Sequence, residues 1–336
     1  MVTVHFIGAG ASSTAGPPTI REFRSVADAV EAKFASSWPA SGRVLFRQAL
    51  DRWTQVLHWA DVEEFYVLAD LLDKLERPIP LQLPPGDVLY MIGRTLEHAT
   101  DPARLGGHTE FLRNHVLRNG PEQNIVITPN WDTVLERAGL VISGVGFDYG
   151  ASNAKTLHRA PTKEVDTRVT YLKLHGSYDW LSCVRCETHW LADTSFVLTL
   201  LEGSGQIECP ACYHDHVRPV VVPPVSEKFP GTPYSSMVLA QVWRRAVEAL
   251  RACAEIRILG YSLPKTDVQL RLLLVKTLSE NPNTPRIVVV SRPKPESEER
   301  DFKRHWLASM GPELGPRLEF RFKTFADWAS EAHQGP

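Results

Sequence analysis

The chain has 336 residues, 43 % of them hydrophobic, and its 37 basic and 39 acidic side chains leave a net charge of −2. This length is enough for one large domain and a small one, each with a core. Because the two kinds of charge are mixed along the chain, we find no electrostatic signal for nucleic-acid binding. Apolar runs are too short to predict a membrane span, and residues 1–8 lack the basic region of a signal peptide. We therefore expect a cytoplasmic protein.

The N-terminal third begins with a strand pattern and continues with helical ones. An apolar run over residues 2–7 ends in a glycine turn, which predicts a buried strand. A helix is expected over residues 26–38. Across residues 43–118 apolar side chains recur at helical spacing, interrupted by four prolines in residues 78–85. We read this block as an all-helical insertion between the first two strands of a sheet.

The same insertion is unusually rich in large apolar side chains. Trp53, Trp59, Phe65 and Tyr66 exceed what a simple lid over a site needs. One interpretation is that they contact a second copy of the chain or a partner protein. The alternative, which the sequence favours equally, is packing inside the monomer.

The remainder alternates between strands and helices. Such alternation is typical of a parallel sheet covered on both faces, and it predicts a Rossmann-like α/β fold. We expect the Rossmann-like domain over residues 1–42, 119–180 and 219–336, the helical insertion over 43–118 and a small metal module over 181–218. The strands are expected at residues 124–128, 169–174, 256–259, 286–290 and 318–322, and the helices at 132–138, 236–253, 267–279 and 296–310.

Four of the five cysteines form two C-x-x-C pairs. The pairs are Cys183 with Cys186 and Cys209 with Cys212. In a reducing compartment this spacing predicts a closed tetrahedral Zn²⁺ site with a structural role. Nearby histidines could replace a ligand, but a solvated surface position is the expectation for His189, His214 and His216. The fifth cysteine, Cys253, falls in a helical stretch and is expected in the core.

Polar turns follow several of the predicted strands. The first is Gly8-Ala9-Gly10-Ala11-Ser12, where glycines let backbone N–H groups approach a phosphate at the start of a helix. The full G-x-G-x-x-G is absent, so a plain tight turn is the alternative. The other turns hold Asn130 and Asp132, then His175-Gly176, then Gly260-Tyr261-Ser262. Asp132 also suits a helix N-cap, and any single histidine is most often a core residue.

Taken in order, these motifs resemble the sirtuin family. Gly8 to Ser12, with Phe23-Arg24-Ser25, is similar to its phosphate and nicotinamide loop. Thr128-Pro129-Asn130-Trp131-Asp132 resembles the Thr-Gln-Asn-Ile-Asp signature, and His175-Gly176 the His-Gly pair. The cysteine pairs follow as its zinc ribbon does, and Gly260 to Leu263 resembles its Gly-Thr-Ser-Leu turn.

The resemblance implies that NAD is bound and consumed as a substrate, with Zn²⁺ as the structural metal. It implies His175 as general base, with Asn130 and Asp132 lining the nicotinamide and ribose pocket. These three are the predicted catalytic residues. The implied NAD-binding residues are Gly8, Ala9, Gly10, Ala11, Ser12, Thr128, Gly260, Ser262 and Ser291.

The chain also departs from the family pattern. Three extra residues lie between Pro18 and Phe23, which leaves the role of Arg24 open. Where the family has a Phe-Gly-Glu segment for acyl-lysine peptides, Val221-Val222-Pro223-Pro224 stands. Two prolines remove two N–H donors from strand addition by a peptide. These departures look more like the prokaryotic sirtuin-like NAD hydrolases of antiphage defence, although the zinc ribbon is shared with deacylases.

Three functions therefore remain open. The favoured one is hydrolysis of NAD to ADP-ribose and nicotinamide. The second is NAD-dependent removal of acyl groups from protein lysines. The third is a sensor that binds NAD or ADP-ribose without turnover, which the set Asn130, Asp132 and His175 disfavours because a pure binder needs no base.

Overall fold

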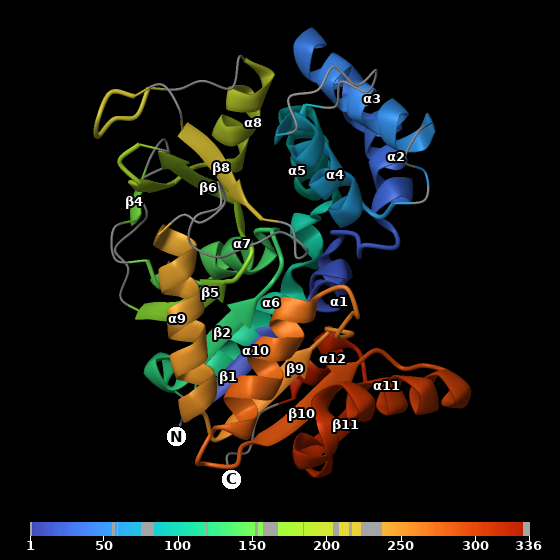
Figure 1. Ribbon diagram of the computed structural model, residues 1–336, viewed down its shortest axis with the longest axis vertical. Coiled ribbons are helices and arrows are strands. Elements are labelled where there is room, and N and C mark those ends of the chain that lie inside the picture. Colours follow the sequence, from blue (N-terminus) through green and yellow to red (C-terminus); the bar gives the residue numbers. More distant parts are fainter. Residues whose placement is uncertain are drawn as a thin grey trace.

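The structure is a computed structural model of the 336-residue chain. It describes residues 2–55, 58, 60–74, 84–118, 120–151, 154–156, 167–183, 185–203, 208–214, 217–222 and 237–331. The ribbon has a lower part built on a large sheet and an upper part in which a small sheet and a group of helices stand side by side (Figure 1).

The large sheet has seven strands in the order β11-β10-β9-β1-β2-β5-β3, and every neighbouring pair is parallel. On one side of β1 the chain forms β2, then β3 at the edge and β5 between them, and on the other side it adds β9, β10 and β11 in succession. The strand order therefore reverses between β1 and β9, which is where open α/β sheets bind ligands. The strands are β1 Thr3–Ile7, β2 Asn124–Thr128, β3 Val145–Asp148, β5 Thr167–Lys173, β9 Glu255–Leu259, β10 Arg286–Ser291 and β11 Leu318–Phe322.

Helices cover both faces of this sheet. α9 and α10 lie in front of the strands in Figure 1, and on the opposite face α6 packs against both α7 and α12. This double coverage explains why β10, with Ile287 to Val290 in succession, is almost continuously apolar. The helices of the lower part are α6 Gly106–Phe111, α7 Val134–Val141, α9 Met237–Ala252, α10 Val268–Ser279, α11 Glu296–Leu314 and α12 Phe325–Ser330, with α1 Ala9–Ser12 directly after β1.

The upper part joins a second sheet to the remaining helices. This sheet has four strands in the order β4-β7-β6-β8. Its strands are β4 Ala154–Thr156, β6 Gly176–Cys183, β7 His189–Leu191 and β8 Val217–Val221, with helix α8 Thr194–Glu202 beside them. The helices next to it are α2 Phe23–Phe34, α3 Ala40–Gln55, α4 Val62–Lys74 and α5 Pro85–Ala99.

Two hydrophobic cores correspond to these two parts. The lower core fills the space between the seven-stranded sheet and its helices. The upper core is shared: helices α2 to α5 contribute Phe46, Trp53 and Phe65, the small sheet contributes Trp190 and Cys183, and the segment before β8 contributes Cys209. The helical insertion and the metal module thus bury their apolar faces against each other.

The fold class predicted from the sequence is confirmed: a parallel sheet carries helices on both faces, and the four paired cysteines cluster. Several elements escaped prediction: the strands β3, β4, β6, β7 and β8 and the helices α8 and α12. β3, β4 and β7 have only three or four residues and carry weak strand patterns. α8 has nine residues within the segment read as the metal module, and it was missed although Ser195, Thr199 and Glu202 recur at helical spacing.

The aromatic residues of the insertion lie inside the molecule. Trp53, Phe65 and Tyr66 are each at most 3 % exposed. Trp53 stacks on Phe65 and donates a hydrogen bond from Nε1 to Ala60 O at 2.8 Å. Packing within the monomer therefore accounts for these side chains, and they no longer argue for a partner; Trp59 lies outside the described residues. Among the described helices, none has both the length and the apolar character that crossing a membrane requires.

Candidate active site and metal centre

The glycine turns after β1 and β9 lie against each other where the strand order of the large sheet reverses, here called the switch point. Gly8 N donates to Leu259 O and Gly10 N donates to Gly260 O, both at 2.9 Å. A Cβ on Gly10 would lie 2.7 Å from Gly260 O, and one on Gly260 would lie 2.2 Å from Ala11 N. Gly260 also has φ +63°, in the region that favours glycine. These glycines are required because two backbones meet here.

The first turn differs from the expected strand-to-helix entry. α1 is a single turn over Ala9–Ser12, followed by a 3₁₀ turn over Ser13–Ala15, and the long helix α2 starts only at Phe23. A helix this short supplies little macrodipole. With the N–H groups of Gly8, Gly10 and Ala11 bonded within the fold and that of Ser12 bonded within α1, the Ala9 N–H and the Ser12 hydroxyl remain as predicted diphosphate contacts.

The turn after β2 is joined to this first turn by side chains. Asn130 Nδ2 donates to Ser12 Oγ at 3.0 Å, although 118 positions separate the two residues. Thr128 Oγ1 donates to Ile7 O at 2.7 Å and accepts from Asn130 N at 3.0 Å. Thr128 therefore locks β1 to β2 and fixes the backbone from which Asn130 reaches Ser12. Two motifs predicted to share one site are in direct contact.

The next strand along the sheet brings His175 to the same edge. β5 ends at Lys173, and the chain crosses from the large sheet into β6 of the small sheet through Leu174 and His175. His175 is 2 % exposed, and its carbonyl accepts from Val222 N at 2.9 Å. Gly176 has φ +76°, and a Cβ there would meet Val220 O at 1.9 Å. The glycine after His175 thus allows β6 to turn onto β8.

A buried cation supports the Asn130–Asp132 turn from below. Lys173, the last residue of β5, is fully buried and donates from Nζ to Asp132 O at 2.6 Å and to Glu136 Oε1 at 2.9 Å. Burial raises the pKa of Glu136 to about 7, and the nearby Lys173 opposes that shift. Neither residue was predicted from the sequence to have a role in the site. A lysine at the end of a buried strand was the signal that could have found them, because such a charge needs a partner.

Asp132 has a structural role as well as its predicted one. It is 7 % exposed, and its Oδ1 accepts from Val134 N at 3.1 Å at the start of α7. The N-cap of α7 is Thr133, so Asp132 is not the cap that the sequence allowed; it forms a turn one residue before the helix. Trp131, between Asn130 and Asp132, points into the upper core, where its Nε1 donates to Val222 O at 3.3 Å. Residues 130–132 therefore contact both cores at the site.

The remaining predicted contacts lie on the β9 and β10 side of the switch point. Ser262 is exposed in the turn after β9, and Ser291 is the partly buried last residue of β10. Gly260 N donates to Val290 O at 3.0 Å, which holds the two strand ends together. Arg24 is placed differently: its guanidinium lies 5.9 Å from the ring of Trp53 on the upper helices.

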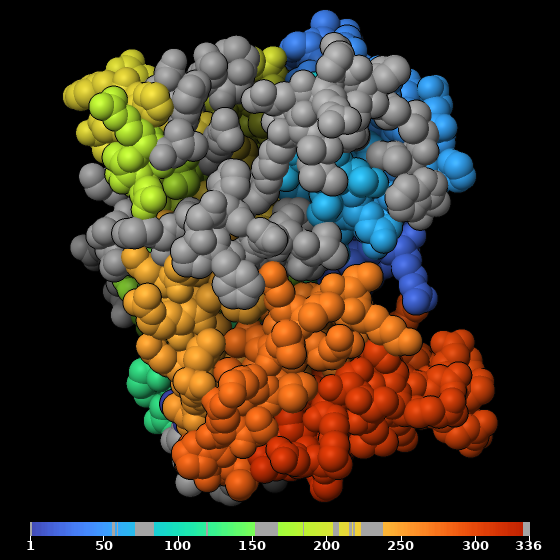
Figure 2. Space-filling view, in the orientation of Figure 1, coloured from blue at the N-terminus to red at the C-terminus, as the bar shows by residue number. Residues whose placement is uncertain are grey.

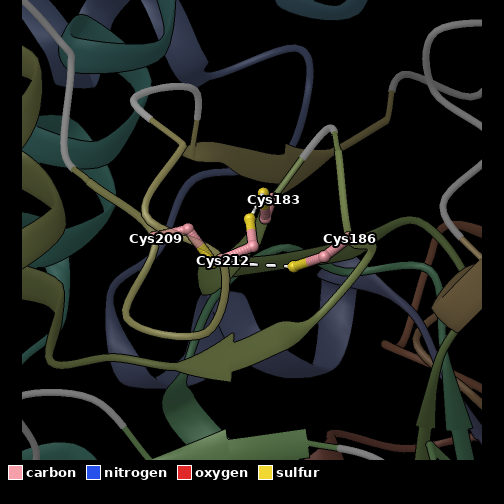
Figure 3. A group of neighbouring side chains, drawn as sticks. All are labelled: Cys183, Cys186, Cys209 and Cys212. Atoms are coloured by element: carbon pink, nitrogen blue, oxygen red, sulfur yellow. Dashed lines mark hydrogen bonds between the residues drawn. The ribbon is translucent and has the colours of Figure 1, made fainter.

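The four paired cysteines form one cluster (Figure 3). All four Sγ atoms lie within 4.8 Å of one another. The two pairs are built alike. Arg185 N donates to Cys183 Sγ and Ala211 N to Cys209 Sγ, both at 3.4 Å. The residue after each pair, Glu187 or Tyr213, has positive φ and returns a backbone hydrogen bond to the first cysteine.

This donor set fits Zn²⁺. The Sγ atoms of Cys183 and Cys212, and those of Cys186 and Cys209, are 3.6 Å apart. A tetrahedral ion with Zn–S bonds of about 2.3 Å needs sulfurs about 3.8 Å apart, so little adjustment is required. A disulfide would bring two sulfurs to about 2.05 Å, and all four cysteines are free. With four sulfur ligands the ion would have no open position, so its role would be structural.

The histidines near the cluster are not all solvated as expected. His189 is fully buried, and its ring meets that of Trp180 edge to face at 4.9 Å. Burial lowers the pKa of His189 to about 4. The expectation of a surface histidine was wrong here because β7 pairs with β6 and turns His189 inward. His216 lies outside the described residues, as do Pro223 and Pro224. Cys253 is fully buried, as predicted.

Comparisons with known proteins return only distant structural likeness. No family model matches the chain, and no curated protein matches it. A Sir2 chain in complex with the inhibitor EX-527, 2'-O-acetyl-ADP-ribose and a deacetylated p53 peptide is 18 % identical, with a TM-score of 0.42 over 98 % of this chain and 90 % of that one. A second chain, described under the mechanism and regulation of Sir2 enzymes, is 15 % identical, with a TM-score of 0.38 over 97 % and 88 %. Neither likeness is strong enough to transfer a ligand or an activity.

The fold and the site by themselves define a class. The chain is a Rossmann-like α/β protein whose polar turns converge at the switch point of its sheet, with a second core closed by a four-cysteine cluster.

Proposed function

We propose that this chain is a sirtuin-type enzyme that binds NAD at the carboxyl edge of the large sheet and hydrolyses it to ADP-ribose and nicotinamide. One observation carries the proposal most directly: Asn130 contacts Ser12 at the switch point. A predicted nicotinamide residue and a predicted diphosphate residue thus lie side by side, as one dinucleotide requires. The order of the motifs along the sequence resembles that of sirtuins, and this resemblance is the reason for proposing NAD as the substrate.

The reaction breaks the bond between nicotinamide and ribose C1'. Nicotinamide carries a positive charge in NAD and leaves as a neutral molecule, so no acid is needed to expel it. Positive charge grows on the ribose, and a fixed polar pocket stabilises it. Water adds to C1', and its proton passes to a base. In this proposal Asn130 orients the water, Asp132 binds the carboxamide and His175 takes the proton.

Water is favoured over an acyl-lysine peptide because the edge of β8 is already engaged. β8 is the outer strand of the small sheet, where an added peptide strand would have to pair. Val222 N faces β6, where it donates to His175 O, so the neighbouring Val221 faces the outer edge, and its carbonyl accepts from Tyr66 Oη at 3.4 Å. A peptide would have to displace this bond, worth roughly 0.5–1.5 kcal/mol.

Deacylation of protein lysines is the second candidate. The four-cysteine cluster favours it, because the sequence resemblance ties the zinc ribbon to deacylases as well. We also propose a role in antiphage defence and assembly with other chains, and each of these needs a test of its own.

The products of purified protein separate the candidates. The protein is incubated with NAD alone, with NAD and an acetyl-lysine peptide, and with the peptide alone, and all products are followed by chromatography. Equimolar ADP-ribose and nicotinamide from NAD alone, little changed by peptide, is the expected result. Loss of acetyl groups with no cleavage of NAD in the absence of peptide would replace hydrolysis by deacylation. NAD binding without products would leave a sensor.

A further inference from the structure

A second cluster of polar side chains lies apart from the Asn130 site, between α10 and α11. These helices meet on the face shown in Figure 2, where the orange and red surfaces adjoin. A pocket of about 480 Å³ opens there. Its wall includes Lys265, Arg271, Asp301, Arg304, His305 and Ser309. The volume falls in the range of small-molecule sites, roughly 300–1,000 Å³.

The pocket wall is rich in cations although the chain as a whole has a net charge of −2. Lys265 and Arg271 form no ion pair with any described residue, whereas Arg304 Nη2 lies 3.1 Å from Asp301 Oδ1. The side chains of that pair are 77 % and 70 % exposed, so water and salt weaken their attraction. Lysine and arginine are donors only. The chemistry of the wall therefore suits an anion with several acceptor oxygens.

His305 links the pocket to the turn after β9. Its Nε2 donates to Leu263 O at 2.7 Å. Leu263 is fully buried with φ +54°, an uncommon backbone conformation for a residue other than glycine. It follows directly on Ser262 and lies three positions after Gly260. Strained residues of this kind are held by their surroundings. A ligand that moves α11 against α10 would act on this turn.

We propose that the pocket between α10 and α11 binds a small phosphorylated anion, of the diphosphate or nucleotide class, at a site distinct from that of NAD. Arg271 and Lys265 hold the phosphate oxygens, and Arg304 turns from Asp301 toward the ligand. Through His305 and Leu263, occupancy changes the conformation of the Ser262 turn. This last effect rests on the proposed function; the binding does not.

The test begins with inorganic pyrophosphate and ADP titrated calorimetrically into the full chain without NAD. We expect binding that weakens as salt rises, and a loss of at least about tenfold in affinity for Arg271→Gln and for Lys265→Gln, since each removes a charge-assisted hydrogen bond. Lys276→Gln on α10 and Arg300→Gln on α11 are matched controls. Both wild-type side chains are exposed and paired with a neighbouring glutamate one turn away, and neither lines the pocket. These controls should change the affinity less than twofold.

A second set of titrations tests whether pyrophosphate binds in this pocket or in the NAD site. Titration of pyrophosphate is repeated with saturating NAD. Unchanged affinity supports a distinct site. Displacement by NAD, together with equally weakened NAD binding in Arg271→Gln, would make the pocket part of the dinucleotide site and overturn the proposal. Equal pyrophosphate affinity in Arg271→Gln, Lys276→Gln and the wild type would overturn it as well.

A third arm addresses the link to the turn. The rate of NAD cleavage is measured with and without pyrophosphate in the wild type and in His305→Leu, which removes the donor to Leu263 O. A change in rate in the wild type that is lost in His305→Leu, with pyrophosphate binding still measurable, is the expected result. If the wild type cleaves no NAD, the proposed function fails, while the calorimetric result still decides whether the pocket binds anions.

Discussion

The two cores of the chain differ in how the elements that form them are arranged along the sequence. In the lower core, the strands and helices alternate along the sequence, and each helix packs on the sheet beside the strands it connects. In the upper core, segments as distant as Phe23 and Val221 lie in one cluster, and the sheet there has four strands, of which only β6 is longer than five residues. The lower core is held by a ladder of seven parallel strands, whereas we infer that the smaller sheet of the upper core needs a further constraint. The four cysteines supply it at one end.

The site lies where these two cores join. Trp131 belongs to the upper core, while Asp132 and Lys173 are anchored on the lower sheet. The catalytic geometry that we propose therefore depends on both cores being folded. Perturbing one core at a time should reveal how far each supports the other.

The largest effect is expected from removing the metal. Cys183→Ser should abolish zinc binding and unfold the upper core, because structural zinc in small modules contributes about 10–16 kcal/mol of binding free energy. Elemental analysis of the wild type should give one zinc per chain. The matched control is Cys253→Ser, which changes a buried cysteine of the lower core. It should keep its zinc. Wild-type protein without zinc, or Cys183→Ser with full zinc and an unchanged melting temperature, would contradict the assignment.

Next in size is the loss of the buried cation at the junction. Lys173→Met leaves Glu136 buried without its partner and Asp132 O without its donor, and should lower the free energy of unfolding by about 3–5 kcal/mol. The double variant Lys173→Met with Glu136→Met should regain most of that stability. NAD cleavage should stay low in both, because neither holds the Asp132 turn. Chemical denaturation and NAD turnover are measured together; activity that returns with stability would show that Lys173 only balances Glu136.

A smaller effect is expected at the meeting of the two glycine turns. Gly260→Ala places a methyl group against Ala11 N at a position with φ +63°, and should cost about 1–3 kcal/mol of stability and weaken NAD binding. Gly86→Ala is the control, since nothing lies within 4 Å of its added Cβ in the first turn of α5. It should change stability by less than about 1 kcal/mol. Equal melting temperatures for the two variants would argue against close backbone contact between the turns.

The smallest effect concerns acid sensitivity of the lower core. His108 is 1 % exposed on α6 beside the Phe325 ring, and burial lowers its pKa to about 3. The unfolded chain binds a proton below about pH 6.5 that the folded chain does not, so stability falls as the pH drops from 6.5 toward 3. At pH 5 this amounts to about 2 kcal/mol.

His108→Leu should remove that part of the pH dependence. The difference in melting temperature between pH 8 and pH 5 is compared for the variant and the wild type. The contributions of other titrating groups to this difference are the same in both proteins and therefore cancel. A smaller difference in the variant is expected. The same difference in both proteins would mean that His108 is protonated without penalty in the folded state.

The lower core could be predicted closely from the sequence because its signals are local. The second strand was placed at residues 124–128, where β2 lies, and the three C-terminal strands were each placed within one residue. Periodicity and turns suffice for such elements. The carboxyl ends of parallel strands share an edge, so the convergence of the turns after β1, β2 and β9 followed as well.

The upper core could not be predicted in the same way. Its partners are distant in sequence, so nothing local indicates that Trp53 shares a core with Trp190 of the small sheet. His189 is buried through strand pairing rather than through its neighbours in sequence. The Lys173–Glu136 pair joins β5 to α7 across 37 positions and is visible only in three dimensions. The four cysteines are the exception, because metal ligation imposes its own spacing.

The central claim is that the polar groups at the junction cleave NAD, and the release of nicotinamide from NAD alone tests it most directly. The rate is measured for the zinc-loaded wild type and for His175→Ala, with zinc content and the circular dichroism spectrum followed for both. The account predicts equimolar nicotinamide and ADP-ribose from the wild type, and a rate lower by about 10²–10⁴ in a variant that keeps its zinc and fold. No nicotinamide from the folded, zinc-loaded wild type, or an equal rate in His175→Ala, would contradict it.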